Sequence, residues 1–218
     1  MSVNDDRITT AEPAARAAAV SPIADPAPLG LAAFALTTFL LSAANAGWMT
    51  TATGSAWLGY ALAYGGLCQL LAGMWEFRNK NVFGATAFGS YGGFWIGLGL
   101  WVLLVKAAAP PPGVLRAVYA AQTVKDLGWI LLAFAIFNTY MLLMSSQVNA
   151  AVFGVFLTLE ATEVILFIGF FTGSSGTIKA GGYVAVVTAL VAWYTSAAGV
   201  ANGLSGPLKL PVGRPLLS

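Results

Sequence analysis

The segment from Asn81 to Val105 contains no charged side chain and is long enough to cross a lipid bilayer as one helix. A hydrocarbon core about 30 Å thick needs roughly 20 apolar residues per helix. The rest of the chain could not cover such a segment in water, because 58% of its residues are hydrophobic and only 8% are charged. Soluble domains carry about 25% charged residues. We therefore expect a membrane protein.

Six segments have the length and low polarity that a membrane span requires. Segments rich in glycine, proline, serine or charge separate them, as is typical of turns. The predicted fold is therefore an all-α membrane protein, a six-transmembrane-helix bundle. The predicted spans are Leu29 to Thr51, Trp57 to Trp75, Phe83 to Val105, Leu127 to Met144, Ala150 to Phe171 and Ala180 to Ala201.

The two ends of the chain differ from this central part. Residues 1–24 are rich in alanine and proline and lack the basic start and apolar core of a signal peptide, so we expect a disordered tail that is not cleaved. Residues 25–204 form the predicted transmembrane domain, and residues 205–218 an extended tail. The longest connection is expected to hold a short interfacial helix from Val114 to Gln122.

Six spans place both termini on the same side of the membrane. Basic residues are more frequent on the cytoplasmic side of membrane proteins. The side that carries the termini has the larger share of them, so we expect a multi-pass protein of the cell membrane with cytoplasmic termini. The basic residues on that side are Arg7, Arg16, Arg78, Lys80, Lys209 and Arg214; those on the other side are Lys106, Arg116, Lys125 and Lys179.

Several kinds of chemistry have no residues to support them. Histidine is absent, which removes the commonest metal ligand and general base. Cys68 is the only cysteine, and the chain has no phosphate-binding loop and no nucleophile elbow. A net charge of +2 gives no reason to expect a nucleic-acid partner. We therefore expect no enzyme activity, no metal and no cofactor.

The third predicted span carries small residues at every fourth position. Ala85, Gly89, Gly93 and Gly97 therefore share one helix face. Small residues let helices approach closely in lipid, where packing drives their association. We expect this face to be a tight helix contact. Tyr91 lies on another face near the middle of the span, where its hydroxyl needs a partner or a polar cavity.

Uncharged polar residues recur inside the spans, and two interpretations remain open for them. A threonine such as Thr38 can bond to its own helix, and the amides Asn45, Gln69 and Asn138 can link neighbouring helices. Alternatively these side chains line a narrow path. Glu76 lies near Arg78 and Lys80, so a surface ion pair is plausible.

Glu160 and Glu163 are spaced three apart on the fifth predicted span. An ionised carboxylate near the bilayer centre costs several kcal/mol, so such residues face the interior of a bundle or a water path. No basic residue lies at a comparable depth in the sequence pattern. We expect at least one of the two to face a conduit and to carry a proton there.

Scattered neutral donors among aromatic rings suit the passage of a small solute with a carboxyl or amide end. Two other functions stay open on the residues alone. One is a channel for a neutral solute such as urea, an amide or ammonia. The other is a membrane enzyme or sensor that uses Glu160 and Glu163.

Four stretches resemble the acetate uptake transporter family. "DPAPLGLAAFALTTFLLS" at residues 25–42 resembles the N-P-A-P-L-G-L signature at the start of that family, with Asp25 in place of the usual asparagine. "YGGLCQLLAGMWEFRNKNVFGATAFGSYGGFW" at residues 64–95 is similar to its second and third spans. "IFNTYML" at residues 136–142 resembles its fourth span, and "AWYTSAAG" with the later "LPVG" its end.

The resemblance implies uptake of acetate and similar short-chain carboxylates, described as proton-coupled or as channel-like. It implies a homo-hexamer in membrane lipid with one pore per protomer, and acetate and protons as partners. It places a constriction of the pore at Phe34, Tyr91 and Leu159. Family positions that are polar or small match Asn45, Gln69, Glu76 and Ala192. Glu160 and Glu163 are not part of the family pattern.

Overall fold

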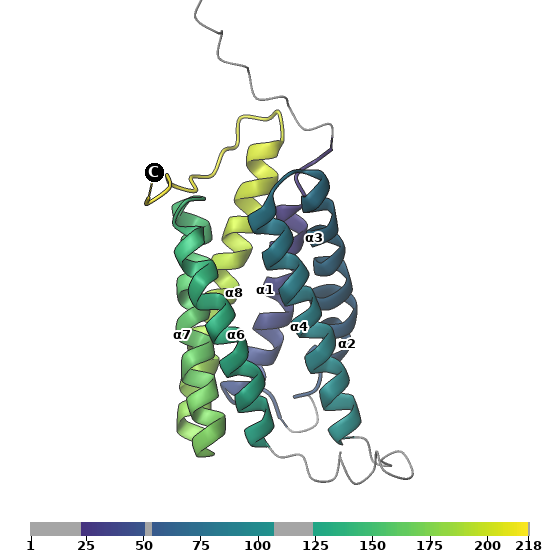
Figure 1. Cartoon of the computed structure of the whole chain (residues 1–218), viewed down its shortest axis with the longest axis vertical. Helices are drawn as coiled ribbons and strands as arrows, with labels where there is room; N and C mark the ends of the chain where they lie inside the picture. The colour runs from purple at the N-terminus through teal and green to yellow at the C-terminus, as the bar shows by residue number, and fades with distance from the viewer. Residues whose placement is uncertain (1–22, 51–53, 107–123, 218) are drawn as a thin grey trace, which may run out of the picture.

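The computed structural model describes residues 23–50, 54–106 and 124–217. They form a bundle of long helices that run along a common axis, and the described part of the chain contains no strand (Figure 1). The predicted all-α membrane fold is confirmed. The elements are α1 (Ala27–Asn45), α2 (Trp57–Leu62), η1 (Ala63–Cys68), α3 (Gln69–Arg78), α4 (Val82–Lys106), α6 (Val124–Ser145), α7 (Ala150–Thr172) and α8 (Ser175–Gly203).

Five helices are each long and apolar enough to cross a membrane. The sixth span consists of α2, η1 and α3, which follow one another without a gap from Trp57 to Arg78. Its middle is a π-helix, in which the backbone is wider than in an α-helix. Gly66 lies in this segment, and a Cβ there would come within 2.6 Å of the Ile96 side chain. The absence of a side chain at Gly66 therefore lets the second span lie close to α4.

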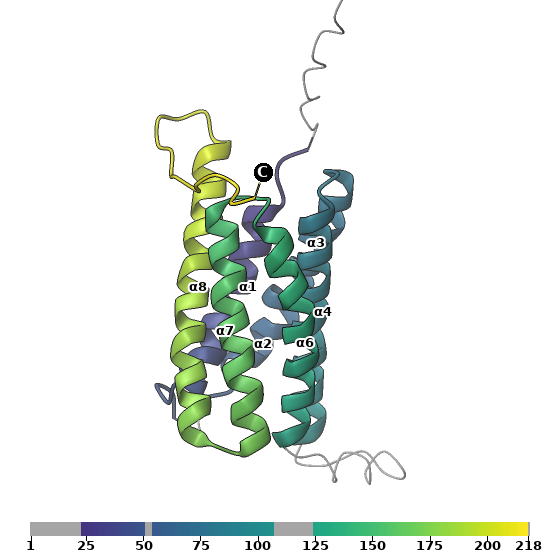
Figure 2. The ribbon, with the colours of Figure 1, turned by 60° about the vertical axis from the view of Figure 1, so that its left-hand side comes forward.

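The six spans form a closed ring. Each of α1, α8, α7 and α6 contacts the next one, α3 packs against α4, and η1 and α3 pack against α1. Figure 2 shows α8, α7 and α6 side by side in front of α1. The ring is weakest between α4 and α6, which touch only sparingly. The interior of this ring is where a path through the protein can lie.

The glycine face predicted to pack tightly does so at Gly89 but not at Gly93 and Gly97. A Cβ on Gly73 would lie 2.6 Å from the backbone nitrogen of Gly89, and one on Gly92 would lie 2.7 Å from the backbone nitrogen of Leu70. Gly93 and Gly97 have no atom within 4 Å of the corresponding position. Within the protomer the expectation was therefore wrong for these two: α3 packs on the neighbouring face, which contains Gly92, and Gly93 and Gly97 line an open groove between α4 and α6.

This difference gives a stability prediction. Gly73→Val would force the α3 and α4 backbones apart, and we expect it to lower the free energy of unfolding by about 3 kcal/mol. Gly93→Val adds the same side chain to a helix but meets open space. In detergent, the melting temperature should fall by about 6 to 12 °C for Gly73→Val and by much less for Gly93→Val. Equal shifts in the two variants would contradict the packing described here.

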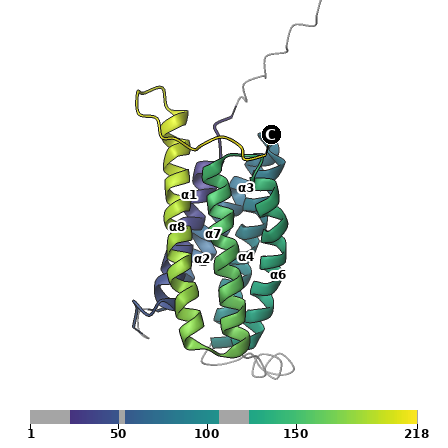
Figure 3. The same ribbon diagram turned by 90° about the vertical axis from the view of Figure 1, so that its left-hand side faces the viewer.

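The C-terminal segment folds back onto the end of the bundle. The Tyr194 hydroxyl donates to the Pro211 carbonyl at 2.6 Å, and the Ala151 amide donates to the Val212 carbonyl at 2.9 Å. The Leu216 amide donates to the Ser146 carbonyl at 2.7 Å. Figure 3 shows this segment passing from the end of α8 across to the start of α7. The predicted extended tail thus forms part of the rim on this side.

The two described ends of the chain lie at the same end of the bundle, as an even number of spans requires (Figure 1). The predicted tail lies outside the described residues up to position 22, and so does the interfacial helix predicted for Val114 to Gln122.

Candidate functional site

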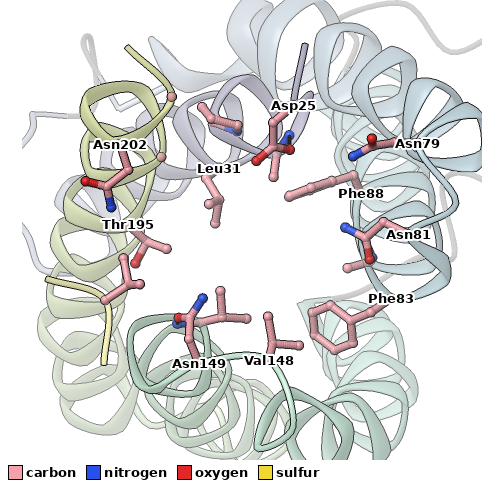
Figure 4. Close-up of a pocket in the computed structure, with 18 of the residues that line it drawn as sticks. Asp25, Leu31, Asn79, Asn81, Phe83, Phe88, Val148, Asn149, Thr195 and Asn202 are labelled. Carbon is pink, nitrogen blue, oxygen red and sulfur yellow. Dashed lines mark hydrogen bonds between the residues drawn. The ribbon is translucent and has the colours of Figure 1, made fainter. Parts of the chain in front are cut away.

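A cavity of about 490 Å³ opens at the end of the bundle that carries the two termini. Its wall comes from the starts of α1, α4 and α7, the end of α8 and the loop after α3 (Figure 4). Its rim is polar, and its floor is apolar, including Leu31, Phe88 and Phe156. The labelled polar side chains around it are Asp25, Asn79, Asn81, Asn149, Thr195 and Asn202.

We call this first cavity the mouth, and local hydrogen bonds fix the elements around it. Asp25 Oδ1 accepts a hydrogen bond from the Ala27 amide at 3.0 Å, as expected for a negative charge at a helix start. The Ser196 hydroxyl donates to the Pro28 carbonyl at 2.6 Å and ties α8 to α1. The Val152 amide donates to Asn149 Oδ1 at 2.9 Å and caps α7. At these helix ends the named hydrogen-bonding groups are therefore already paired within the protein.

Below the floor of this cavity the structure brings together the three residues expected at the constriction. Phe34, Tyr91 and Leu159 are 5%, 3% and 6% exposed and belong to one apolar cluster. The rings of Phe34 and Tyr91 meet edge to face with centroids 5.8 Å apart. All three residues also line a second cavity, of about 50 Å³. The three predicted constriction residues therefore lie together at the second cavity.

The cavities follow one another along the bundle axis, as α7 shows most clearly. Phe156 lines the mouth, Leu159 and Glu163 line the second cavity, and Phe170 lines a third cavity of about 50 Å³ toward the opposite end. The second and third cavities share Asn45 of α1. The interior of the ring is thus a line of separate spaces, and Tyr91 lies at the second of them.

Tyr91 also belongs to a buried hydrogen-bond network between α4, α6 and α7. Its hydroxyl oxygen lies 3.0 Å from Asn138 Oδ1 and 3.2 Å from Glu163 Oε1. Asn138 Nδ2 donates to the Phe156 carbonyl at 3.0 Å and to Glu160 Oε2 at 2.7 Å. The Thr139 hydroxyl lies 2.9 Å from Glu160 Oε1. Asn138 therefore connects Tyr91 to Glu160, while the Tyr91 hydroxyl itself contacts Glu163.

The other residues predicted for the site occupy different environments. Thr38 and Asn45 line the second cavity. Gln69 and Ala192 are buried but line none of the three cavities described above. Glu160 lies behind Asn138, away from those cavities.

The expected surface ion pair of Glu76 was wrong. This side chain is fully buried, and Asn79 Nδ2 donates to its Oε2 at 3.2 Å. It lies against the first turn of α4, where a Cβ on Gly84 would come within 2.7 Å of its Oε1. Glu76 lies inside α3, which continues to Arg78, and not in the loop. Its side chain packs against α4.

Sequence reasoning missed two features of the site. The rim of the mouth is built from four asparagines that lie at or near the ends of different helices, and only their position next to predicted spans could have indicated it. Trp95 was not among the predicted site residues, but it is 3% exposed and lines the second cavity. Its neighbour Phe94 fills the space between Trp95 and Phe134.

A ring of six membrane spans around a line of solute-sized cavities defines a class: a multi-pass membrane protein of the transporter and channel type. Comparison with known proteins makes the class specific. Residues 8–214 match the model of the GPR1/FUN34/yaaH family, so the chain belongs to this family. The predicted relationship to acetate transporters is thereby confirmed.

Several relatives carry functional names. The chain is 39% identical to "Ammonia transport outward protein 2" of Saccharomyces cerevisiae, over 88% of this chain and 67% of that protein. It is 38% identical to "Acetate permease A" of Emericella nidulans, over 87% and 65%. It is 31% identical to the "Succinate-acetate/proton symporter SatP" of Escherichia coli, over 88% and 96%.

A solved structure supports the same fold. The structure of the bacterial acetate channel SatP superposes with a TM-score of 0.78 at 31% sequence identity, and the match covers 88% of this chain and 99% of that chain. The six-span bundle is therefore the fold of an acetate channel of known structure.

Proposed function

We propose that this protein carries acetate and similar short-chain carboxylates across the membrane together with protons. The path runs from the mouth at the termini through the Phe34, Tyr91 and Leu159 constriction to the cavities beyond it. The observation that carries the proposal is the line of cavities, with two rings and a leucine packed together at the second one, in a relative of proteins named for acetate transport.

The polar residues have separate roles in this proposal. Thr38, Asn45 and Glu163 contact the solute in the narrow part, because they line the second cavity. Asn138 and Glu160 act through Tyr91, since Asn138 contacts both. Gln69, Glu76 and Ala192 support the wall from behind, where they are fully or almost fully buried.

Assembly and orientation are also proposals. The family resemblance favours a homo-hexamer with one pore in each protomer, and the excess of basic residues favours cytoplasmic termini. Native mass spectrometry of protein in mild detergent would count the protomers directly. Protease protection in vesicles would locate the termini.

Labelled acetate uptake into proteoliposomes tests the function. We expect an outside-acid gradient of one pH unit to raise acetate accumulation about tenfold if one proton enters with each acetate. Initial rates must be compared with protein-free vesicles, because acetic acid itself permeates lipid. A rate equal to that of protein-free vesicles, with and without the gradient, would contradict the proposal.

A second candidate is transport of a neutral solute, and the 39% identity to a protein named for ammonia transport favours it. A path for a neutral solute would need no charged wall, and the proposed constriction carries no charged side chain. The same vesicles can be loaded with a pH-sensitive dye and exposed to ammonium or to labelled urea. Faster entry of either solute than in protein-free vesicles, without acetate uptake, would favour this candidate.

A further inference from the structure

Three of the residues that line the second cavity each carry a buried polar atom that has no hydrogen-bond partner in the described part of the chain. They are Thr38 Oγ1, Trp95 Nε1 and Glu163 Oε2, on side chains that are 6%, 3% and 3% exposed. Buried polar groups are normally hydrogen-bonded, and leaving one unpaired costs about 1–3 kcal/mol. Three such atoms around one space of about 50 Å³ indicate that a small polar molecule completes them.

The hydrogen-bond network fixes where the protons are. The Phe156 carbonyl can only accept, so the Asn138 group that faces it must be the amide nitrogen. Asn138 Oδ1 therefore faces Tyr91, and the single hydroxyl proton of Tyr91 is donated to it. The Tyr91 oxygen must then accept from Glu163 Oε1, which means that this carboxyl carries a proton. Glu163 Oε2, its carbonyl oxygen, is left as an acceptor without a partner, on a residue that lines the cavity.

The surroundings of Glu163 agree with this assignment. The titratable groups near it are Tyr91 of α4 and Glu160 of its own helix, and Tyr140 of α6 lies on the far side of the network. From α1 and α8 the cavity receives only groups that do not titrate, such as Thr38 and Ala185. No lysine or arginine is among its lining residues. Glu160 differs, since Asn138 and Thr139 offer it two donors.

We propose that the second cavity binds a short carboxylic acid in its neutral form. The acid donates its O–H to Glu163 Oε2 and accepts at its carbonyl from Trp95 N–H or the Thr38 hydroxyl. A carboxylate anion has no proton for Glu163 Oε2 and would meet two oxygen lone pairs there. Space for a water requires about 10–15 Å³, so the cavity suits a molecule of a few heavy atoms, such as a two-carbon acid.

This inference rests on the proposed function and deepens it: the proton crosses the constriction on the substrate and not on a side chain. Glu163 is then a neutral binding group throughout. A primary amide of the same size can place an N–H donor and a carbonyl acceptor in the same way, so acetamide should occupy the same site and compete with acetic acid.

Two substitutions at one position separate this inference from its alternative. Glu163→Gln keeps a carbonyl oxygen toward the cavity and an N–H toward Tyr91, so acetate uptake should stay within about threefold of wild type. Glu163→Leu removes both groups and should lower uptake at least tenfold. Loss of uptake in Glu163→Gln would overturn the inference and indicate a carboxyl group that gains and loses the transported proton.

Gentler variants and a control keep the test interpretable if Glu163→Leu does not fold. Thr38→Val removes one donor and keeps the shape, and Trp95→Phe removes the other donor while keeping an aromatic ring of smaller size. Each should weaken inhibition of acetate uptake by acetamide several-fold. Thr158→Val is the matched control, because that hydroxyl bonds only to carbonyls of its own helix. Unchanged acetamide inhibition in both donor variants would also overturn the site.

A failure of the proposed function can be told apart from a failure of the site. If wild-type protein takes up no acetate, the transport proposal fails. The site is then judged by melting temperature in detergent: acetamide should stabilise wild type and Glu163→Gln but not Glu163→Leu. Absence of stabilisation in wild type at high acetamide concentration would count against the site itself.

Discussion

Leu159→Ala is expected to admit larger carboxylates. In the proposed path Leu159 forms the constriction with Phe34 and Tyr91, and its side chain is almost completely buried in the same apolar cluster. Removing it leaves space at the narrowest point without adding a polar group. A pocket discriminates about 10-fold or more per methylene of a substrate, so the ratio of butyrate to acetate uptake should rise about tenfold. Competition between the two labelled acids in proteoliposomes measures this ratio.

The control is Leu157→Ala, on the same helix but with a side chain that is 48% exposed. It should leave the ratio unchanged. Tyr91→Ala should also raise the ratio, with a larger loss of stability because Asn138 and Glu163 lose a partner. Unaltered selectivity in both Leu159→Ala and Tyr91→Ala, with normal expression, would show that these residues do not form the constriction.

Asn138→Leu is expected to destabilise the protein and to abolish acetate uptake. The side chain is fully buried and serves Tyr91, Glu160 and the Phe156 carbonyl at once. Leucine has a similar size but leaves these three groups without their partner, at about 1 kcal/mol each. We expect the free energy of unfolding to fall by about 3 kcal/mol. Transport should fail because the Tyr91 hydroxyl then keeps only its contact with Glu163, and the constriction loses its link to α6.

Thermal unfolding in detergent and uptake at a temperature well below the transition separate the two effects. Thr139→Val is a useful comparison, since it removes one donor to Glu160 but leaves the bonds of Asn138 to Tyr91 and Phe156 in place. It should retain most of the uptake. An Asn138→Leu protein with wild-type uptake would exclude a role for the network in transport.

The number and position of the spans could be predicted because bilayer thickness sets the length of an apolar helix. Each predicted span corresponds to a helix or, in the second, to three consecutive segments. The π-helix at Ala63–Cys68 could not be predicted, because it depends on how α2 and α3 fit against α1 and α4. The constriction residues came from resemblance to a family, and their meeting in space is a property of the packed ring.

Periodicity alone was a weaker guide to packing. The third span has glycines on two adjacent faces, and repetition at every fourth residue favoured the face with Gly93 and Gly97. The structure packs α3 against the face that contains Gly92, because the Gly73 backbone meets Gly89 beside it. A helix has the same repeat whichever neighbour it meets, so only the tertiary arrangement decides which face is covered.

Hydropathy by itself determined that this chain forms a helical membrane bundle with polar groups inside it, since lipid neither solvates charges nor satisfies an open backbone. The roles of the polar groups depended on the tertiary structure. Glu160 and Glu163 are neighbours on one helix, yet one faces two donors and the other faces a small cavity. That difference arises from α6 and α4, which place Asn138 and Tyr91 between them, and no local pattern in α7 encodes it.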